Sequence, residues 1–310
     1  GLEVHKKHVR GIRMLIRERL ENFDFSNSEQ KIVTYILEKK AAIQEMTTKE
    51  IAEATYTSPS TLVRIAHKMN FSGWSDLKEA FLKEEEYLQK HFSEINANLP
   101  FQRNDTILSI ASKIAALEKE SIDDTLSLIT HDDLQKAIQI IRKSSYTSLF
   151  AVSNNLLITQ EFQHNMSRIK KRVEICLLQG ETIFKAHLAD PSSCAIIVSY
   201  SGETSILNET IQYLKANKIP IIAITNIGDN TTARLADCVL RICTREKLYS
   251  KIATFSTDSA IVYLLDVLYS CIFALDYDAN LQLRISTSKM IEAGRSSTVD
   301  IIKEEDHVSR

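Results

Sequence analysis

The chain has 310 residues, of which 44% are hydrophobic and 25% charged, and its formal net charge is −2. This length accommodates two domains with a sizeable core, and the composition is typical of a soluble globular protein. The charge excludes a global basic field, so any nucleic-acid site must be local. No apolar run is expected to span a bilayer and no signal peptide is visible, which predicts a cytoplasmic protein without a membrane partner.

The cysteines and the N-terminal segment narrow this further. The five cysteines are odd in number and lack the close pairing of a metal motif, so we expect buried thiols, no metal site and no cofactor. Residues 1–13 are rich in His, Lys and Arg and are left out of the fold prediction, as either a native arm or an added segment.

Residues 14–95 have the pattern of a small helical domain. Capping boxes at Ser26–Glu29 and Thr47–Glu50 predict two helix starts, and Ser58-Pro59 predicts a third, with Ser58 at the N-cap and Pro59 at the first helical position. The short turn between the last two helices is typical of a helix-turn-helix.

The helix that follows Ser58 is expected to present a polar face to DNA. No Asp or Glu occurs between Glu53 and Asp76, and a surface that meets phosphates must lack carboxylates. Short polar residues at its N-terminus suit entry into the major groove, although a solvated face of a small bundle gives the same pattern. The expected inner face is Leu62, Val63, Ala66 and Met69. The predicted DNA-binding residues are Ser58, Ser60, Thr61, Arg64, His67 and Lys68.

A linker at 96–105 and an α/β domain at 106–285 are predicted next, with a C-terminal tail at 286–310. Apolar strands alternate with amphipathic helices after the linker, which implies a doubly wound parallel sheet flanked by helices, with ligands at the carboxyl ends of the strands. A long apolar helix at 260–275 is expected in the core or in a dimer contact. The predicted strands are 149–152, 173–178, 194–199, 221–225 and 239–243, and helices are expected at 107–117, 157–169 and 205–217.

One of these strand ends carries the segment Ser199-Tyr200-Ser201-Gly202-Glu203-Thr204. A strand that turns into a helix through a hydroxyl-rich loop leaves backbone N–H groups at the positive end of the helix, which is a site for phosphate. Gly202 permits a close backbone approach or a positive φ. A plain helix cap formed by Ser201 or Thr204 is the alternative.

The two halves together resemble the RpiR family of bacterial transcriptional regulators, in which a helix-turn-helix precedes a sugar isomerase (SIS) domain. The resemblance implies operator DNA as a partner, a phosphorylated sugar as effector, and assembly as a homodimer or higher oligomer. In the first half it rests on Ser26–Glu29, Ile51–Ala54, Ser58–Thr61, Arg64 and Phe71–Ser75; in the second it rests on Ser199–Thr204, Ile222–Thr225, Ala233–Asp237 and Asp266–Tyr269.

The chain departs from the family pattern in three places. The first SIS loop, usually Gly-x-Gly-x-Ser, reads Ala151-Val152-Ser153-Asn154-Asn155, so Asn155 stands where a phosphate-contacting serine is expected. Thr257-Asp258 replaces the usual Ser-Arg, and Tyr56 occupies a turn position usually held by glycine. The resemblance implies the effector-binding residues Ser153, Asn155, Ser199, Ser201, Gly202, Glu203 and Thr204.

We therefore predict a regulator that is not an enzyme. The competing class is a SIS-type sugar-phosphate isomerase or lyase, for which Glu203, Glu246 and His187 are the available bases, without a readable constellation. A DNA-binding protein whose SIS domain only dimerises is the third hypothesis. The apolar helix around Val262, Leu265, Leu268 and Tyr269 is expected to supply part of the dimer contact.

Overall fold

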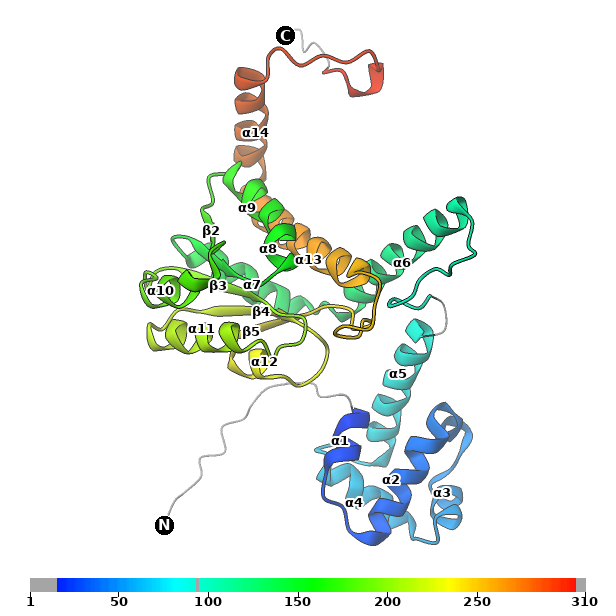
Figure 1. Cartoon of the computed structure of the whole chain (residues 1–310). Coiled ribbons are helices and arrows are strands. Elements are labelled where there is room, and N and C mark those ends of the chain that lie inside the picture. Colours follow the sequence, from blue (N-terminus) through cyan, green and yellow to red (C-terminus); the bar gives the residue numbers. More distant parts are fainter. Residues whose placement is uncertain (1–15, 93–94, 305–310) are drawn as a thin grey trace.

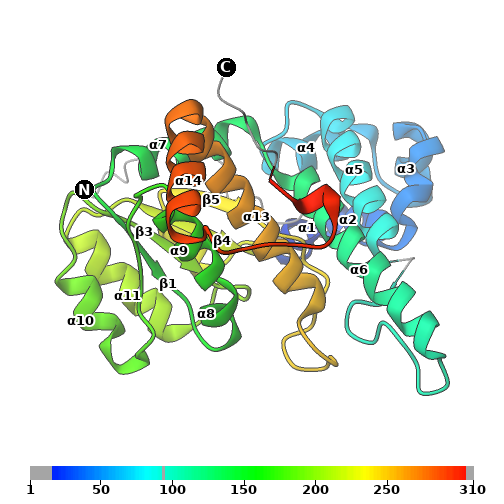
Figure 2. The ribbon, with the colours of Figure 1, turned by 90° about the horizontal axis from the view of Figure 1, so that it is seen from above.

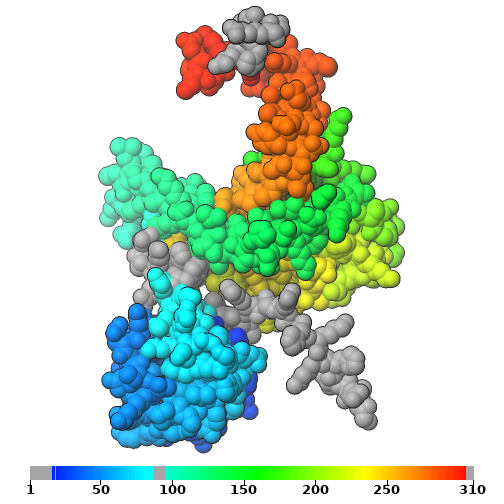
Figure 3. Space-filling model, turned by 180° about the vertical axis from the view of Figure 1, so that it is seen from behind, coloured from blue at the N-terminus to red at the C-terminus, as the bar shows by residue number. Residues whose placement is uncertain are grey.

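The computed structural model describes residues 16–92 and 95–304. Residues 1–13, Met14 and the last residues of the predicted tail lie outside this range. The helical domain and the α/β domain form separate lobes, blue to cyan and green to orange respectively (Figures 1 and 3). The boundaries at 95, 105 and 285 stay a prediction; the last of them falls inside a helix, α14 (Tyr277–Ile291).

The first lobe is helical throughout its described residues, and its helix starts follow the capping boxes. Ser26 and Thr47 each accept a backbone N–H three residues on, while Glu29 and Glu50 accept from the cap backbone, which confirms both boxes. A core centred on Ile32, Ile65 and Phe81 holds the helices together. The elements are α1 (Ile16–Asn22), α2 (Asn27–Lys39), η1 (Lys40–Glu45), α3 (Thr48–Ala54), α4 (Pro59–Lys68) and α5 (Trp74–Phe92).

The second lobe begins with two helices and then alternates strands with helices, as predicted. Its helices are α6 (Ile107–Leu128), α7 (His131–Lys143), α8 (Asn154–Ile158), α9 (Gln160–Ser167), α10 (Thr182–His187), α11 (Ser205–Ala216), α12 (Thr231–Leu235), α13 (Phe255–Ala274) and α14, with short turns η2 (Gln179–Glu181) and η3 (Asp300–Ile302). Its strands are β1 (Thr147–Phe150), β2 (Val173–Ile175), β3 (Cys194–Val198), β4 (Ile221–Thr225) and β5 (Cys238–Arg241).

The five strands form one parallel sheet in the order β2-β1-β3-β4-β5. Helices cover both faces, which confirms the predicted fold class (Figure 2). Side chains of β3 alternate between the two cores: Cys194, Ile196 and Val198 pack on the α7, α9 and α13 side, whereas Ala195 and Ile197 pack on the α10 and α11 side.

Several predicted boundaries were wrong. The expected helix 157–169 is two helices, α8 and α9, which meet at Thr159, whose hydroxyl donates to the Asn155 carbonyl at 2.7 Å. The strand expected at 173–178 ends at Ile175, and β1 and β5 begin earlier than predicted. The helix expected to end at Leu117 continues to Leu128.

Helix α13 shows how composition and environment differ. By length and hydropathy alone it could cross a membrane, which the sequence analysis did not anticipate. In the described structure it packs against α6, α7 and α9, and its residues Ala260, Leu264 and Leu268 are fully buried. Such packing is that of a core helix, and its mean apolarity follows from burial against neighbours on several sides.

Candidate functional site

Helix α4 presents a polar outer surface in the first lobe. Ser58 takes the N-cap position with extended backbone and Pro59 opens the helix, as predicted. Ser58, Ser60, Arg64 and His67 are exposed. The Arg64 guanidinium donates to the Thr61 hydroxyl at 3.1 Å, so Arg64 is held against the front end of the helix.

Two residues of α4 lie on the opposite side from the one predicted. Thr61 is 2% exposed and lies inward, whereas Val63 is 38% exposed, so the expected placement of both was wrong. Ile65, which the prediction omitted, is fully buried. The reason is rotation of the helix: with Leu62 and Ala66 inward, a 3.6-residue period brings positions 61 and 65 inward and turns 63 outward.

Lys68 is committed to its own domain. Its ammonium lies 2.7 Å from the Glu29 carboxylate on α2 and over the Phe25 ring. Glu29 is itself only 2% exposed. Burial raises the pKa of Glu29, but the hydrogen bonds from Lys68 and Ser26 outweigh it and hold the pKa below its usual value. Lys68 therefore links α2 to α4, while its side chain stays 40% exposed on the same helix as the exposed Arg64.

The turn between α3 and α4 contributes a residue that the sequence prediction did not propose for DNA. Tyr56 is 92% exposed and has a φ of 54°, the left-handed conformation that glycine prefers. The signal was present in the sequence, since Tyr56 replaces the family's glycine in an acid-free segment. It lies two residues before the N-cap of α4, where an exposed aromatic side chain can contact a phosphate or a sugar through its hydroxyl.

The predicted ligand site lies at the carboxyl edge of the sheet. In the strand order β2-β1-β3-β4-β5 the winding of the sheet reverses between β1 and β3, and such a switch point is where α/β sheets bind ligands. The first loop (Ala151–Asn155) follows β1 and the second loop (Ser199–Thr204) follows β3. These strands pair at Phe150 and Ile197, so the two loops start side by side.

The second loop is closely ordered around Gly202. Gly202 has a φ of 69°, and a Cβ there would lie 2.0 Å from Asn230 side-chain atoms, so only glycine fits. Its N–H donates to the Ser199 hydroxyl at 3.2 Å, and the Glu203 N–H donates to the Ser201 hydroxyl at 3.2 Å. The Ser199 and Thr204 hydroxyls lie 3.3 Å apart. Three hydroxyls and the start of α11 therefore gather around one short turn.

Carboxylates occupy the starts of α12 and α13 at this edge, but not those of α11 and the short helix α8. Glu203 accepts from the N–H and hydroxyl of Thr231 at 2.8 and 2.7 Å, which places it at the start of α12 and lowers its pKa. Glu246 accepts from the Thr257 N–H at 2.7 Å, at the start of α13. The first turn of α11 contains no acidic residue. Its positive end is thus left for an external anion.

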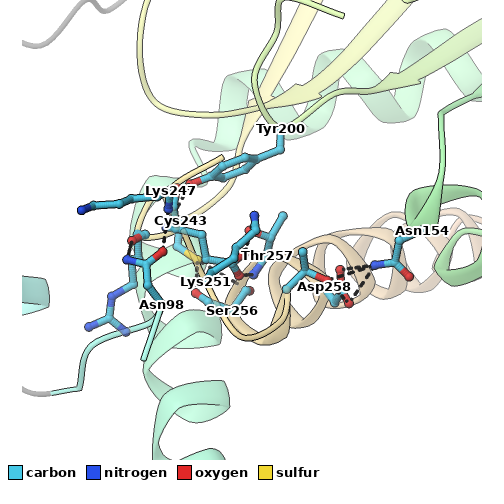
Figure 4. Close-up of polar contacts among 12 residues, drawn as sticks. Asn98, Asn154, Tyr200, Cys243, Lys247, Lys251, Ser256, Thr257 and Asp258 are labelled. Atoms are coloured by element: carbon cyan, nitrogen blue, oxygen red, sulfur yellow. Dashed lines mark hydrogen bonds and ion pairs between the residues drawn. The ribbon is translucent and has the colours of Figure 1, made fainter. Parts of the chain in front are cut away.

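The first loop is tied to α13 through Asp258, which departs from the family pattern. The Asn154 amide donates to both oxygens of Asp258, at 2.9 and 3.0 Å, and to Thr254 at 3.1 Å (Figure 4). Asp258 therefore places an anion where the family has a cation, and its carboxylate binds the Asn154 amide of the first loop. Ser153 has a φ of 55° at a position where the family has glycine. Asn155 is half-buried beside the loop.

The candidate bases for catalysis are engaged or distant. Glu246 is 7% exposed, and its carboxylate lies 3.1 Å from the Lys251 ammonium as well as at the start of α13. His187 ends α10 and packs edge-on against the Tyr213 ring at 5.9 Å. Across residues 16–92 and 95–304 no group of three His, Cys, Asp or Glu side chains could hold a metal.

An open hollow of about 880 Å³ lies elsewhere, between α9 and the beginning of β2. It is lined by Gln160, His164, Lys170 and Arg172, among others. Because Val173 begins β2, this hollow adjoins the amino end of that strand, opposite the edge where the two loops lie. It does not coincide with the ligand site.

Comparisons with known proteins agree with this architecture. Residues 11–90 match the model of the helix-turn-helix domain of the rpiR family, and residues 140–270 match the SIS domain. An uncharacterized HTH-type transcriptional regulator of Caldanaerobacter subterraneus is 24% identical over 89% of this chain and 95% of its own. The HTH-type transcriptional regulator RpiR of Escherichia coli is 22% identical over 72% of this chain and 73% of its own.

Solved structures give the same fold. The Vibrio vulnificus NanR protein complexed with ManNAc-6P is 19% identical, with a TM-score of 0.56 over 91% of this chain and 100% of that one. The sugar isomerase domain of an RpiR transcription factor from Sphaerobacter thermophilus has a TM-score of 0.52 at 14% identity, over 58% of this chain and 98% of that one. The chain is a helix-turn-helix regulator by architecture. It combines an N-terminal helix-turn-helix domain of the rpiR family with a SIS domain, as in RpiR-type regulators.

Proposed function

We propose that this protein binds operator DNA through α4 and releases or tightens its hold when a phosphorylated sugar binds the second loop of the SIS domain. The genes it controls would serve uptake or metabolism of that carbohydrate, and it would act in the cytoplasm beside the chromosome. The family supports the DNA-binding half, and a neighbour of similar fold is complexed with a phosphosugar.

The distribution of carboxylates carries the effector half of the proposal. Among the described helix starts at the sheet edge, those of α12 and α13 are taken by Glu203 and Glu246, and α11 combines an acid-free first turn with three hydroxyls. A phosphate there would meet backbone N–H groups and the hydroxyls of Ser199, Ser201 and Thr204. No cation is needed, because the helix end supplies roughly half a positive charge.

Non-catalytic sensing is favoured over isomerisation by the state of the acid–base groups. A general base must reach the sugar carbon that loses its proton. Glu203 and Glu246 are each held by two contacts that fix them to helix starts or to Lys251. Incubation with a sugar-phosphate panel tests this: turnover at enzyme-like rates would reverse the conclusion, whereas binding without turnover agrees with it.

Assembly as a homodimer is part of the proposal, and the half-buried Val262 and Tyr269 of α13 remain candidates for part of its surface. Leu265 and Leu268 of α13 are buried in the protomer core. Exposed apolar side chains instead gather on α14 and on the first turns of α6, where Ile107 is 85% and Leu108 79% exposed. Helix α14 has no buried residue in the protomer and projects from the lobe (Figure 1). Such surfaces in a DNA-binding regulator suit contact with a second copy.

The DNA-binding half is tested with Arg64→Ala. We expect operator affinity to fall by about 1–3 kcal/mol if Arg64 contacts a guanine, measured by mobility shift on duplexes that wild-type protein selects from a random pool. Lys83→Ala, which removes an exposed cation from α5, is the matched control and should stay within about twofold of wild type. Equal affinity for all three proteins would remove α4 from the DNA-reading role.

Lys68→Ala separates bracing from phosphate contact. Because Lys68 pairs with buried Glu29, its loss should lower the free energy of unfolding and leave the salt dependence of DNA binding unchanged. A flatter salt dependence with unchanged stability would instead make Lys68 a phosphate contact.

A further inference from the structure

The second loop and the predicted linker both hydrogen-bond to one three-residue backbone segment, Arg245–Lys247. The loop binds its middle residue and the linker binds the other two. Tyr200, inside the second loop, donates its hydroxyl to the Glu246 carbonyl at 2.7 Å and accepts from the Glu246 N–H at 3.0 Å (Figure 4). Through these two bonds, one phenol hydroxyl pairs with both the backbone N–H and the backbone carbonyl of Glu246. Burial raises the pKa of Tyr200, so the hydroxyl keeps its proton and remains a donor.

Asn98 of the linker hydrogen-bonds to the backbone of Arg245 and Lys247, the two neighbours of Glu246. Its amide donates to the Arg245 carbonyl at 3.4 Å, and its side-chain oxygen accepts from the Lys247 N–H at 2.7 Å. Its own carbonyl accepts from the Ile252 N–H at 2.9 Å. The linker is therefore docked at this point and is not a free tether, since Ala97 beside Asn98 is 4% exposed.

The shared backbone is itself anchored from the other side. The Arg245 guanidinium lies 3.1 Å from Glu120 of α6, and Glu246 holds the first turn of α13 through Thr257. Lys251 pairs with Glu246 at 3.1 Å and lies over the Tyr200 ring at 5.6 Å. Movement of Tyr200 would thus disturb two backbone bonds and the surroundings of a buried ion pair together.

From this convergence we propose that Tyr200, the Arg245–Lys247 backbone and Asn98 form the coupling element that links effector binding to the DNA-binding lobe. The inference rests on the proposed sensing function and names its regulatory contact. An anion bound at the start of α11 meets Ser199 and Ser201, the chain neighbours of Tyr200, and so changes how the phenol holds Glu246. The bonds to Asn98 change with it, and Asn98 lies on the covalent connection to α5.

The first experiment needs no ligand. In full-length Tyr200→Phe, hydrogen exchange at the Lys247 and Ile252 amides should accelerate by about fivefold or more, although Tyr200 accepts from neither amide. Tyr213→Phe, which changes a tyrosine of α11 outside the loop, should leave both amides as in wild type. Equal exchange in the two variants would overturn the proposal.

The second experiment measures coupling directly. The probes are N-acetylmannosamine 6-phosphate, glucose 6-phosphate and inorganic phosphate, with calorimetry for ligand affinity and anisotropy on a selected duplex for DNA affinity. Asn98→Ala should bind the active probe within about twofold of wild type, while the ligand-induced change in DNA affinity shrinks at least threefold, from a starting range of about 5–150-fold. Asn104→Ala, an exposed asparagine of the same linker, should retain the full change.

The outcomes separate the two claims. If a probe binds and shifts DNA affinity equally in Asn98→Ala and wild type, sensing stands and the coupling element is wrong. If no probe binds any variant, the effector proposal fails, and the exchange measurement alone then upholds or overturns the link between Tyr200 and Asn98.

Discussion

The two loops that flank the switch point of the sheet differ in how much of the family pattern they keep. The second loop keeps its glycine, and the fold depends on it, because Asn230 occupies the space where a Cβ would lie. The first loop has lost both glycines but not the backbone shape, since Ser153 still adopts a φ of 55°. Two parallel strands thus support one loop that is fixed by packing and another that accepts strain.

That difference indicates where function is concentrated. The Asn154 amide and the Asp258 carboxylate bind each other at the first loop, whereas the second loop has partly exposed Ser201 and Thr204 beside the start of α11, with Ser199 buried. If the proposed effector binds here, we expect it to bind mainly through the second loop. The following substitutions test this asymmetry.

The largest effect is expected from Gly202→Ala. The new Cβ would force Asn230 aside, and Asn230 caps α12 by accepting the Ala233 N–H at 2.9 Å. Together with the positive φ, we expect a loss of about 3 kcal/mol or more in the free energy of unfolding, measured in urea. Gly180→Ala, which meets open space, is the control and should change stability by less than about 0.5 kcal/mol. Equal losses would remove the special status of Gly202.

Ser201→Ala is expected to weaken ligand binding more than Asn155→Ala. Removing a hydrogen bond to a charged group costs about 1.5–3 kcal/mol, or roughly ten- to a hundredfold in affinity. Asn155→Ala, in the first loop, should cost less than about 0.5 kcal/mol of ligand-binding free energy. Calorimetry with the same sugar phosphates measures both, and DNA affinity without ligand should be unchanged. The reverse order would place the phosphate at the first loop.

Ser153→Gly should stabilise the protein by about 1 kcal/mol, because relief of the left-handed backbone exceeds the extra entropy of the unfolded chain. Ser153→Ala keeps the same φ with a Cβ and should give no gain, which separates strain from loss of the hydroxyl. Thermal unfolding of both variants provides the comparison. A loss of stability in the glycine variant would mean that the first loop is not strained.

The smallest effect is expected from Asn155→Ser, which restores the hydroxyl usual in the family. With Asp258 still opposite, we expect a gain in phosphosugar affinity of less than about 1 kcal/mol. A larger gain, seen by calorimetry, would show that the first loop remains part of the ligand site.

Local patterns in the sequence predicted much of the fold. The capping boxes at Ser26 and Thr47 and the start at Ser58-Pro59 formed as expected, and the strand at 221–225 was placed to the residue. Each depends on residues within four positions along the chain, so neighbours encode it. The same reasoning located the second loop at a strand end, because hydroxyls and Gly202 follow directly upon an apolar run.

Partnerships across the fold could not be derived in this way. Lys68, a predicted DNA-binding residue, also pairs with Glu29, 39 residues away. Glu203 turned to Thr231, and Asn98 to the backbone of Arg245 and Lys247, 147 residues or more from it. Periodicity also misplaced Thr61 and Val63 on α4. The pattern of apolar residues does not fix the rotation of the helix about its axis, which is set by how Leu62 and Ala66 pack in the core.

The sequence by itself determined the two domains, their order, the helix starts and the hydroxyl-rich turn, since these follow from caps, periods and apolar runs. The tertiary structure alone decided which helix starts Glu203 and Glu246 occupy, that Lys68 pairs with Glu29, and where the linker docks. Whether a carboxylate can accept from the N–H groups at a helix start depends on the distance between them. That distance is set only when the strands pair and the helices pack on the sheet.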